Sequence, residues 1–489
     1  MELSIRGDIM DNIKAKYTSY VIPNYNLGDN KYIEQMLSLW DKIYFKYNPI
    51  GYEYIEELKE LRIPRGLDIN FIEKTFRRPV DVEYKPDPHE VASYRLKVEP
   101  RNDIQRKAIS YLLGEGDFYY TKKYSQLTLN LDTGDGKTYC VIAALTFMKT
   151  KSIIITHINS IKKQWYDSFL KMTDLNEQFI CDISGKKDIE RLLKRDDWKY
   201  KVYLVNHSSL RSYGDKYGWD KITELFKRIK VGVKVIDEAH LEFENMVKID
   251  LYTNTKKTIY LTATFGRSEF KENKLFNLCF KNIAKYGIET RNDKRRHIIY
   301  MGVLFDSKPS VDEQLMIKNK HGFDKNAYID YEINKPIFYD VIKYILDYFK
   351  DKEGKILILS SKIESSEAIA DYLKNIYPDK TISVYNSKIP KEEKEKALSC
   401  DIVSSTPKSA GTGLDIKGLR FEINTEPTSS EILTNQIAGR LRVYGPEEYS
   451  FYIELVDIGF NKVYNMYKHR QRYYKKKCAK LLELKYDKK

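Results

Sequence analysis

The sequence has few of the features that cross-link a chain or place it in a membrane. Its 489 residues include only five cysteines, which lie far apart and form no CxxC pair, so neither a disulfide framework nor a zinc ribbon is supported. No apolar run reaches the roughly 18 residues that a membrane span needs, and the start, MELSIRGDIM, does not resemble a signal peptide. We therefore expect an intracellular protein of a reducing compartment, with no membrane role.

Positive charge is abundant. Lysine and arginine outnumber acidic residues by 84 to 70, a net charge of +14, which favours an anionic partner such as nucleic acid. The segment 461–489 holds eleven of these cations against two acidic residues. We predict a basic C-terminal helix or tail there. It either adds nonspecific affinity for a duplex or packs Tyr464, Tyr467 and Leu481 against the preceding domain.

The length corresponds to roughly three domains. Two series of short apolar runs alternate with amphipathic stretches, the pattern of α/β domains built on parallel sheets. We predict an N-terminal accessory domain, a candidate for DNA recognition, at 1–88, and α/β domains at 89–290 and 291–460. The expected strands are 127–131, 152–156, 202–206, 233–237 and 258–263 in the first series, and 297–304, 355–361, 381–386, 400–406 and 450–456 in the second.

A phosphate-binding loop is predicted directly after the first strand, in the sequence LDTGDGKT. A glycine-rich turn between a strand and a helix lets backbone N–H groups surround a triphosphate. Leu131 stands where such loops usually have their first glycine, and a helix-capping turn is the alternative interpretation. The predicted ATP contacts are Thr133, Gly134, Asp135, Gly136, Lys137, which would neutralise the phosphates, and Thr138, which would ligate Mg²⁺.

Adjacent carboxylates follow one hundred residues later, in Asp237-Glu238-Ala239-His240 at the end of an apolar strand. Ligands of open α/β sheets bind at this edge. We expect Asp237 to hold Mg²⁺ and Glu238 to deprotonate the attacking water. Three further polar side chains, His240, Thr262 and Thr264, are candidates for coupling this segment to the rest of the domain. Upstream, the Gln105 amide can pair with an adenine edge.

The second series carries STPKSAGTGLDI (405–416) and QIAGRLR (436–442). With these segments the chain resembles the superfamily 2 helicases of the DEAH-box type, over about residues 95–460. The resemblance implies two tandem RecA-like domains that close over ATP and Mg²⁺, and it adds five residues to the ATP site. Gly413 and Asp415 would bind the nucleotide, and Gln436, Arg440 and Arg442 would act in catalysis. The two arginines are two residues apart instead of three, so which one is the arginine finger stays open.

The same resemblance implies nucleic-acid contacts at the strand ends of both domains, where a satisfied loop residue is the alternative at each position. The candidates are His157, Asn159, Asn206, Ser208 and Ser209 in the first domain, and Ser361, Lys362, Asn386, Lys388, Thr406 and Lys408 in the second.

Within the superfamily, the compact layout looks like the phage and viral DNA helicases of the XPB-like, branch-migrating type. This implies an ATP-dependent helicase or translocase that remodels branched or duplex DNA in recombination, repair or replication, alongside other proteins of those processes, in the host cytoplasm if the source is viral. The alternatives are a translocase that releases transcripts or displaces proteins, an RNA helicase, and a nucleic-acid-binding scaffold without catalysis.

Overall fold

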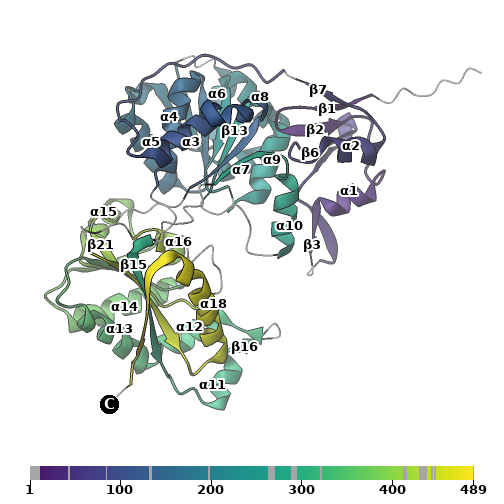
Figure 1. The fold of residues 1–489 in the computed structure, drawn as a ribbon. Coiled ribbons are helices and arrows are strands. Elements are labelled where there is room, and N and C mark those ends of the chain that lie inside the picture. The colour runs from purple at the N-terminus through teal and green to yellow at the C-terminus, as the bar shows by residue number, and fades with distance from the viewer. Residues whose placement is uncertain are drawn as a thin grey trace, which may run out of the picture. The chain divides into compact units, whose positions relative to one another are not determined.

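The computed structural model describes residues 11–41, 44–83, 85–131, 135–195, 199–239, 241–262, 270–287, 295–319, 322–410, 416–428, 438–441, 444 and 448–487. Contacts divide the chain into two units, Met1–Ile288 and Glu289–Lys489. Each unit contains a seven-stranded parallel sheet with helices between the strands, which confirms the two predicted α/β domains (Figure 1). None of the described helices combines the length and apolar character needed to cross a membrane.

The sheet of the first α/β domain has the strand order β10-β11-β9-β12-β13-β8-β14. Five strands match the predicted apolar runs, and the edge strands β10 and β14 were not predicted. The strands are β8 (Gln126–Asn130), β9 (Ser152–Thr156), β10 (Ile180–Ile183), β11 (Val202–Asn206), β12 (Val233–Ile236), β13 (Lys257–Thr262) and β14 (Ala284–Gly287).

Two helical layers cover this sheet, because consecutive strand residues point to opposite faces. Ile154 packs with α3, α4 and α5, whereas Ile153 and Ile155 pack with α6 to α10. Both faces are therefore buried, as is usual for parallel sheets. The helices are α3 (Asp103–Leu113), η2 (Gly116–Lys123), α4 (Lys137–Met148), α5 (Asn159–Met172), η3 (Glu177–Phe179), α6 (Lys186–Lys194), α7 (His207–Tyr217), α8 (Trp219–Ile229), α9 (Phe243–Tyr252) and α10 (Phe270–Cys279).

The N-terminal segment forms a five-stranded sheet in the order β5-β6-β2-β1-β7, whose fold the sequence analysis left unnamed. Only β1 and β7 pair in parallel. A separate hairpin, β3–β4, extends from it. The elements are β1 (Ile13–Ala15), β2 (Ser19–Ile22), α1 (Lys31–Met36), β3 (Ser38–Asp41), β4 (Lys46–Pro49), β5 (Glu53–Ile55), η1 (Glu56–Leu58), β6 (Glu60–Pro64), α2 (Ile69–Phe76) and β7 (Val80–Val82).

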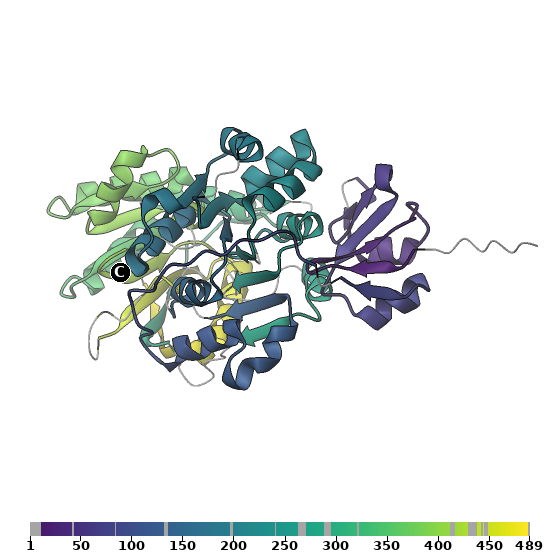
Figure 2. The same ribbon diagram turned by 90° about the horizontal axis from the view of Figure 1, so that it is seen from above.

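This small sheet packs directly on the first α/β domain (Figure 2). Gly66 lies so close to the end of α10 that a Cβ atom there would sit 2.1 Å from the Cys279 carbonyl oxygen. The Gly66 carbonyl also accepts a hydrogen bond from the Asn282 N–H group at 2.9 Å. On the other side, Asn254 accepts a bond from the Tyr17 N–H group at 2.9 Å. One hydrophobic core runs through both parts, so they form one unit.

The second unit has the strand order β19-β20-β18-β21-β22-β15-β23. Strands β21 and β23 were not predicted. The elements are β15 (Arg295–Phe305), α11 (Val311–Met316), β16 (Lys318–Asn319), β17 (Gly322–Phe323), α12 (Lys325–Ile333), α13 (Pro336–Tyr348), β18 (Lys355–Leu359), α14 (Ile363–Ile376), β19 (Ile382–Tyr385), α15 (Lys391–Ser399), β20 (Ile402–Ser405), α16 (Pro407–Ala410), β21 (Leu419–Asn424), β22 (Ser450–Asp457), α18 (Asn461–Lys477) and β23 (Cys478–Lys485).

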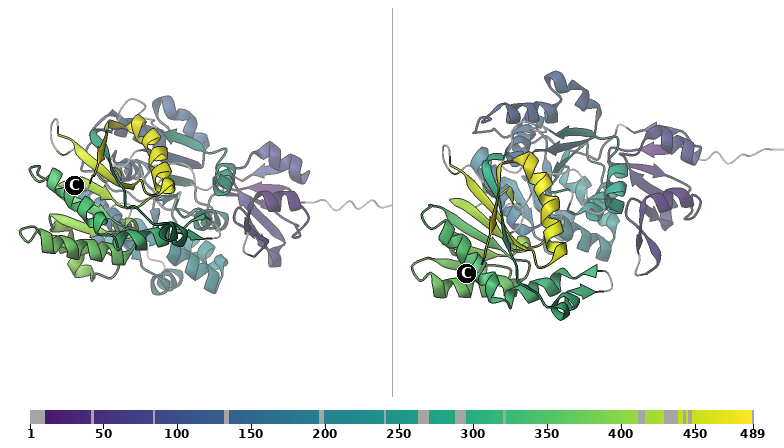
Figure 3. Two further views of the ribbon diagram at one scale, coloured as in Figure 1. Left: turned by 90° about the horizontal axis from the view of Figure 1, so that it is seen from below. Right: turned by 60° about the horizontal axis from the view of Figure 1, so that its bottom comes forward.

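The basic C-terminal segment is an integral part of this second unit (Figure 3). Helix α18 packs on the sheet, and β23 then pairs in parallel with β15. Arg470 of α18 is buried and donates two hydrogen bonds, of 2.7 and 2.8 Å, to the Glu454 carboxylate on β22. The Tyr474 ring stacks on Tyr300 with centroids 4.1 Å apart. These contacts need a folded helix, so the segment is not a loose tail.

Candidate nucleotide site and nucleic-acid edges

The predicted phosphate loop lies between β8 and α4. Gly136, which precedes α4, has φ +88°, and a Cβ atom there would lie 2.4 Å from Nε2 of Gln105. Both constraints select glycine. Lys137 opens α4 and donates a hydrogen bond from Nζ to the Leu131 carbonyl oxygen at 2.9 Å. The ammonium group is thus held beside the positive end of a helix, where anions bind.

Gln105 fastens this loop to the start of α3. Its Oε1 accepts a hydrogen bond from the Arg101 N–H group at 2.9 Å, and its Nε2 donates to the Asp135 carbonyl oxygen at 2.9 Å. The side chain is completely buried. These two bonds use one of the two amide hydrogens and one of the two oxygen lone pairs. Adenine recognition by Gln105 stays a prediction, and its loop-fastening role is a finding that the sequence did not supply.

The acidic segment forms a turn directly after β12, and main-chain bonds tie it to both neighbouring strands. The Asp237 N–H group donates to the Ile155 carbonyl oxygen of β9 at 2.9 Å, and the Ala239 N–H group donates to the Leu261 carbonyl oxygen of β13 at 3.0 Å. Glu238 between them has φ +49°, a conformation that few residues other than glycine adopt. The backbone therefore fixes both carboxylates at the carboxyl edge of the sheet.

Trp165 holds the Asp237 carboxylate in place. This residue of α5 is buried, and its indole Nε1–H group donates to Asp237 Oδ2 at 2.7 Å. The other oxygen, Oδ1, accepts a hydrogen bond from the Glu238 N–H group at 2.9 Å. Sequence reasoning missed this role for Trp165. The available signal was that a buried tryptophan needs a partner for its N–H group.

Burial changes the acidity of Glu238. It raises the pKa of the Glu238 carboxyl to about 7; the Lys137 ammonium group opposes the rise, and the neighbouring Asp237 adds to it. A carboxyl whose pKa lies near neutral pH is well matched to accepting a proton from water. The arrangement thus offers a cation after β8, and a bound carboxylate and a candidate proton acceptor after β12, at one edge of the same sheet.

Thr262 ends β13 one residue after the carbonyl group that binds the Ala239 N–H group, and its side chain is completely buried. The main-chain bond between Ala239 and Leu261 therefore connects the acidic segment to the residue next to Thr262. Several other predicted site residues lie outside the described residues, namely Thr133, Gly134, His240, Thr264, Gly413, Asp415, Gln436 and Arg442, as does the side chain of Lys408.

Arg440 lies in the interior of the second unit. Its Nη1 group is 3.4 Å from Glu422 Oε1 on β21, and both side chains are buried. A buried ion pair of this kind holds its arginine in place, because separation would leave a charge without its partner. The predicted catalytic role of Arg440 remains a prediction.

Two family models match the chain, one in the first α/β domain and one in the second. "Type III restriction enzyme, res subunit" matches residues 97–267, and "Helicase conserved C-terminal domain" matches residues 339–443. The first contains the phosphate loop and the acidic segment, and the second contains Arg440. The chain carries the two core domains of a superfamily 2 helicase. This pair of domains indicates an ATP-hydrolysing enzyme.

Individual relatives are more distant. A "DNA 3'-5' helicase XPB" of Kineococcus radiotolerans is 26% identical over 149 residues, which cover 30% of this chain and only about a quarter (25%) of that relative. Yeast Dbp5 bound to RNA and ADP BeF3 aligns with TM-score 0.54, 14% identity, and coverage of 78% of this chain and 89% of Dbp5. A putative HsdR subunit of a type I restriction enzyme from Vibrio vulnificus aligns with TM-score 0.52 and 14% identity, and the alignment covers 78% of this chain and 68% of that subunit. These structures share the RecA-like helicase fold.

The helicase site has the groups that a nucleotide and Mg²⁺ require. The N-terminus of α4 has no side-chain cap, so its N–H groups face the loop, next to Lys137. Thr138 lies half-buried in the first helical turn. Among the described residues, no cluster of three His, Cys, Asp or Glu side chains could hold a metal alone. Mg²⁺ sites in NTPases use one or two carboxylates plus substrate phosphates, and the Asp237 carboxylate fits that donor set.

The predicted nucleic-acid contacts of the first helicase domain lie at the ends of β9 and β11. Ser208 is exposed and Ser209 half-exposed in the first turn of α7. Asn206 is buried and bridges the two strand ends, because it accepts a hydrogen bond from Thr156 at 2.8 Å and donates one to Asn159 at 2.6 Å. Asn206 therefore has a structural role at this edge, and its contact with nucleic acid stays a prediction. His157, half-buried after β9, has its pKa lowered by burial.

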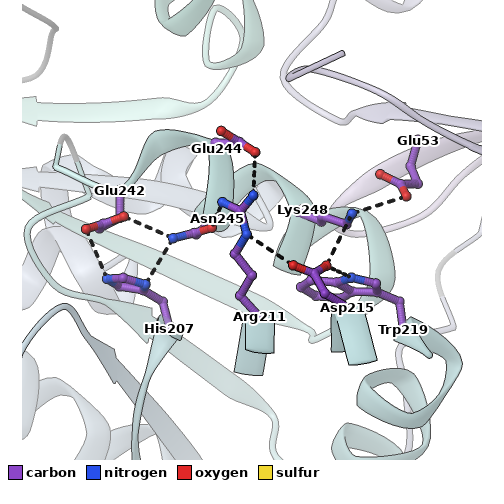
Figure 4. Close-up of polar contacts among 9 residues, drawn as sticks. All are labelled: Glu53, His207, Arg211, Asp215, Trp219, Glu242, Glu244, Asn245 and Lys248. Carbon is purple, nitrogen blue, oxygen red and sulfur yellow. Dashed lines mark hydrogen bonds and ion pairs between the residues drawn. The ribbon is translucent and has the colours of Figure 1, made fainter. Parts of the chain in front are cut away.

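A polar network extends from this edge towards the N-terminal sheet (Figure 4). His207, which opens α7, contacts Asn245 of α9 through Nδ1 at 3.1 Å, and its Nε2 lies 3.4 Å from Glu242. Arg211 on the next turn of α7 contacts Asn245 as well. The chain of contacts continues through Asp215 and Lys248 to Glu53 of β5, with Trp219 donating to Asp215 at 2.8 Å and Lys248 lying 3.4 Å from Glu53. The network fixes α7 and α9 against β5.

In the second helicase domain the predicted contacts follow β18, β19 and β20. Lys388 is exposed, although its Nζ lies 3.6 Å from Glu367. Asn386 is buried and donates to the same Glu367 at 3.2 Å. Lys362 pairs with Asp330. The remaining candidates are half-buried Ser361 and buried Thr406, whose hydroxyl accepts a hydrogen bond from the Ser409 N–H group at 3.0 Å. Asn386 and Thr406 serve the local structure, and Lys388 is the most accessible cation of the described set.

We expect Trp165→Phe to lower ATP turnover about 10- to 100-fold and to raise the Mg²⁺ requirement, because the phenyl ring keeps the packing but cannot bind Asp237. Trp219→Phe is the matched control, since it removes an indole bond to Asp215 far from the loop. Steady-state hydrolysis over a Mg²⁺ titration, with melting curves of both variants, measures the effect. Equal losses in the two variants would contradict a role for Trp165 at the site.

Burial and the nearby Arg211 charge lower the pKa of His207 to about 4. The folded state therefore binds fewer protons than the unfolded state between pH 6.5 and 4, so this histidine makes stability fall as pH falls through that range. The loss amounts to about 3 kcal/mol at the acidic end. Histidine hydrogen–deuterium exchange read by mass spectrometry gives its pKa directly. His207→Gln should show a smaller drop in urea midpoint between pH 7 and 5; an equal drop would refute the assignment.

The two arginines of the QIAGRLR segment should behave differently. Arg440→Ala removes the buried ion pair with Glu422, so we expect a loss of about 3–5 kcal/mol of stability. Arg442→Ala should keep the wild-type melting temperature and lose ATP hydrolysis far more than ATP binding. Differential scanning fluorimetry and nucleotide titration distinguish the two effects. A stable Arg440→Ala protein that binds but does not hydrolyse ATP would assign the finger to Arg440 instead.

Proposed function

We propose that this helicase is an ATP-dependent DNA translocase that unwinds or remodels branched or duplex DNA without reading its sequence. The observation that carries the catalytic part is the fixed pair Asp237 and Glu238, which the backbone of β9 and β13 holds at the strand edge. A nucleic-acid scaffold without catalysis would not need Trp165 bound to Asp237, nor Glu238 in a strained conformation.

The side chains divide the chemistry between them. Lys137 and the N–H groups at the start of α4 bind and orient the phosphates. Glu238 accepts the proton of the attacking water, for which its raised pKa suits it. Asp237 and Thr138 would hold Mg²⁺, which when bound neutralises charge on the transferring phosphoryl group. An arginine of the second domain adds charge stabilisation and makes hydrolysis depend on both domains.

DNA is the favoured track for two reasons. The family model of the first domain describes a restriction enzyme subunit, and the XPB relative is described as a DNA helicase. RNA unwinding, transcript release and protein displacement are the competing functions. The similarity to Dbp5 concerns the fold alone, so it does not favour RNA.

Measuring ATP turnover with single-stranded, duplex, forked and four-way DNA beside RNA tests the proposal. We expect stimulation by DNA, largest with branched molecules, and binding that weakens steeply with salt because the contacts are to phosphates. Lys137→Ala and Glu238→Gln should each lower turnover by about a thousandfold or more while DNA binding stays within about twofold. Lys187→Ala and Glu177→Gln, which change exposed residues of α6 and η3, are the matched controls.

The outcomes separate the competing functions. Stimulation by RNA but not DNA would overturn the choice of track. DNA-stimulated turnover without unwinding of forks or migration of four-way junctions would favour displacement of proteins or transcripts. Wild-type turnover in Lys137→Ala would refute the assigned chemistry.

A further inference from the structure

The β3–β4 hairpin places an unusual number of aromatic side chains in solvent. Trp40 and Tyr47 face each other across the two strands, and Tyr44 and Phe45 lie at the tip. Their exposed fractions are 40%, 47%, 72% and 77%, respectively. Figure 1 shows this hairpin, labelled at β3, reaching away from the N-terminal sheet alongside α10. A single exposed ring is ordinary, but four rings on one short hairpin are not required for folding.

Local contacts join the described residues on the two sides of the hairpin. Asp41 accepts hydrogen bonds from the Tyr44 N–H group and from the Asn48 side chain, both at 3.1 Å. The edge of the Trp40 ring meets Tyr47 with centroids 4.9 Å apart. Phe45 has φ +49°, which is rare for a bulky residue and costs conformational energy. The turn therefore keeps Phe45 outside at a cost to stability that no described packing contact offsets.

The base of the hairpin rests on the helicase domain. A groove of about 290 Å³ separates it from α10, with Leu39 and Trp40 on one side and Leu275 and Leu278 on the other. α10 is the helix that follows β13, the strand ending at Thr262. The hairpin is thus seated on the domain that carries the phosphate loop and the acidic segment.

The charges around the rings favour a nucleic-acid partner over a protein partner. Lys46 lies over the Tyr44 ring at 5.7 Å from its centroid, and Lys271 and Lys274 of α10 are exposed beside the groove. The cores of protein–protein interfaces are depleted of lysine. Sites for single-stranded nucleic acid instead combine cations, which follow the phosphates, with exposed rings, on which bases of any sequence stack.

We propose that Tyr44 and Phe45 stack on the bases exposed at a DNA junction, so that this hairpin separates the strands while the helicase domains move. The inference rests on the proposed function and adds the residues that meet the junction. Trp40 and Tyr47 support the tip, and the three lysines bind the adjoining phosphates.

The test uses the full chain and a forked duplex with 2-aminopurine as the first unpaired base. Replacing both tip rings, Tyr44→Ala with Phe45→Ala, should lower fork unwinding about tenfold or more and abolish the 2-aminopurine fluorescence change. ATP turnover stimulated by single-stranded DNA should stay within about twofold of wild type, because the ATP site is untouched. Leucine at both positions keeps apolar bulk without a π face and should be as defective as alanine.

The matched control removes two rings of similar exposure outside the hairpin, Tyr32→Ala of α1 with Tyr119→Ala of η2. It should unwind like wild type. Unchanged unwinding and fluorescence in the tip variant would overturn the inference, as would a defect in the tip variant that appears only as loss of self-association. Failure of the proposed function gives a different result, because DNA would then not stimulate ATP turnover even in the wild-type protein.

Discussion

The site depends on two main-chain hydrogen bonds beyond the end of β12, from Asp237 to β9 and from Ala239 to β13. They hold the turn that follows the central strand between its two neighbours, so main-chain bonds fix the backbone that carries the two carboxylates. Trp165 then restricts the rotation of the Asp237 carboxylate. Because β8 lies beyond β13 in the same sheet, the phosphate loop reaches the same edge.

Features that depend on residues close together in the sequence could be predicted, and contacts between distant segments could not. Local patterns predicted most of the strands, the loop glycine Gly136 and the acidic pair Asp237 and Glu238. The structure places the loop and the acidic pair at one edge of the same sheet. The partners of Asp237 and Gln105 come from distant segments, and no local pattern specifies which buried N–H group meets which oxygen. β23 was missed because its sequence, CAKLLELK, mixes charged residues with leucines without strict alternation, so it also fits the continuation of an amphipathic helix.

Arginine shows why residue type alone does not assign a role. Arg440 lies in the helicase-like segment QIAGRLR, and Arg470 lies in the basic C-terminal segment. Both side chains are buried in the second unit, where Arg440 pairs with Glu422 and Arg470 pairs with Glu454. A guanidinium group tolerates such burial because its planar donors match a carboxylate. The family pattern predicts a catalytic arginine in this segment, but the choice between the two arginines depends on which side chain is already buried in an ion pair.

The same reasoning changes the meaning of the net charge of +14. Lys234 is paired with Asp250 inside the first unit, and Arg470 is neutralised within the second, so part of the basic composition never reaches the surface. In the proposed function, affinity for nucleic acid comes from cations that stay exposed, such as Lys388 at a strand end and the lysines beside the aromatic hairpin. Phosphate contacts weaken with salt, whereas stacking on Tyr44 and Phe45 does not release counterions. The two proposed contacts, with the phosphates of a strand and with the bases of a junction, would thus depend on different forces and on different parts of the chain.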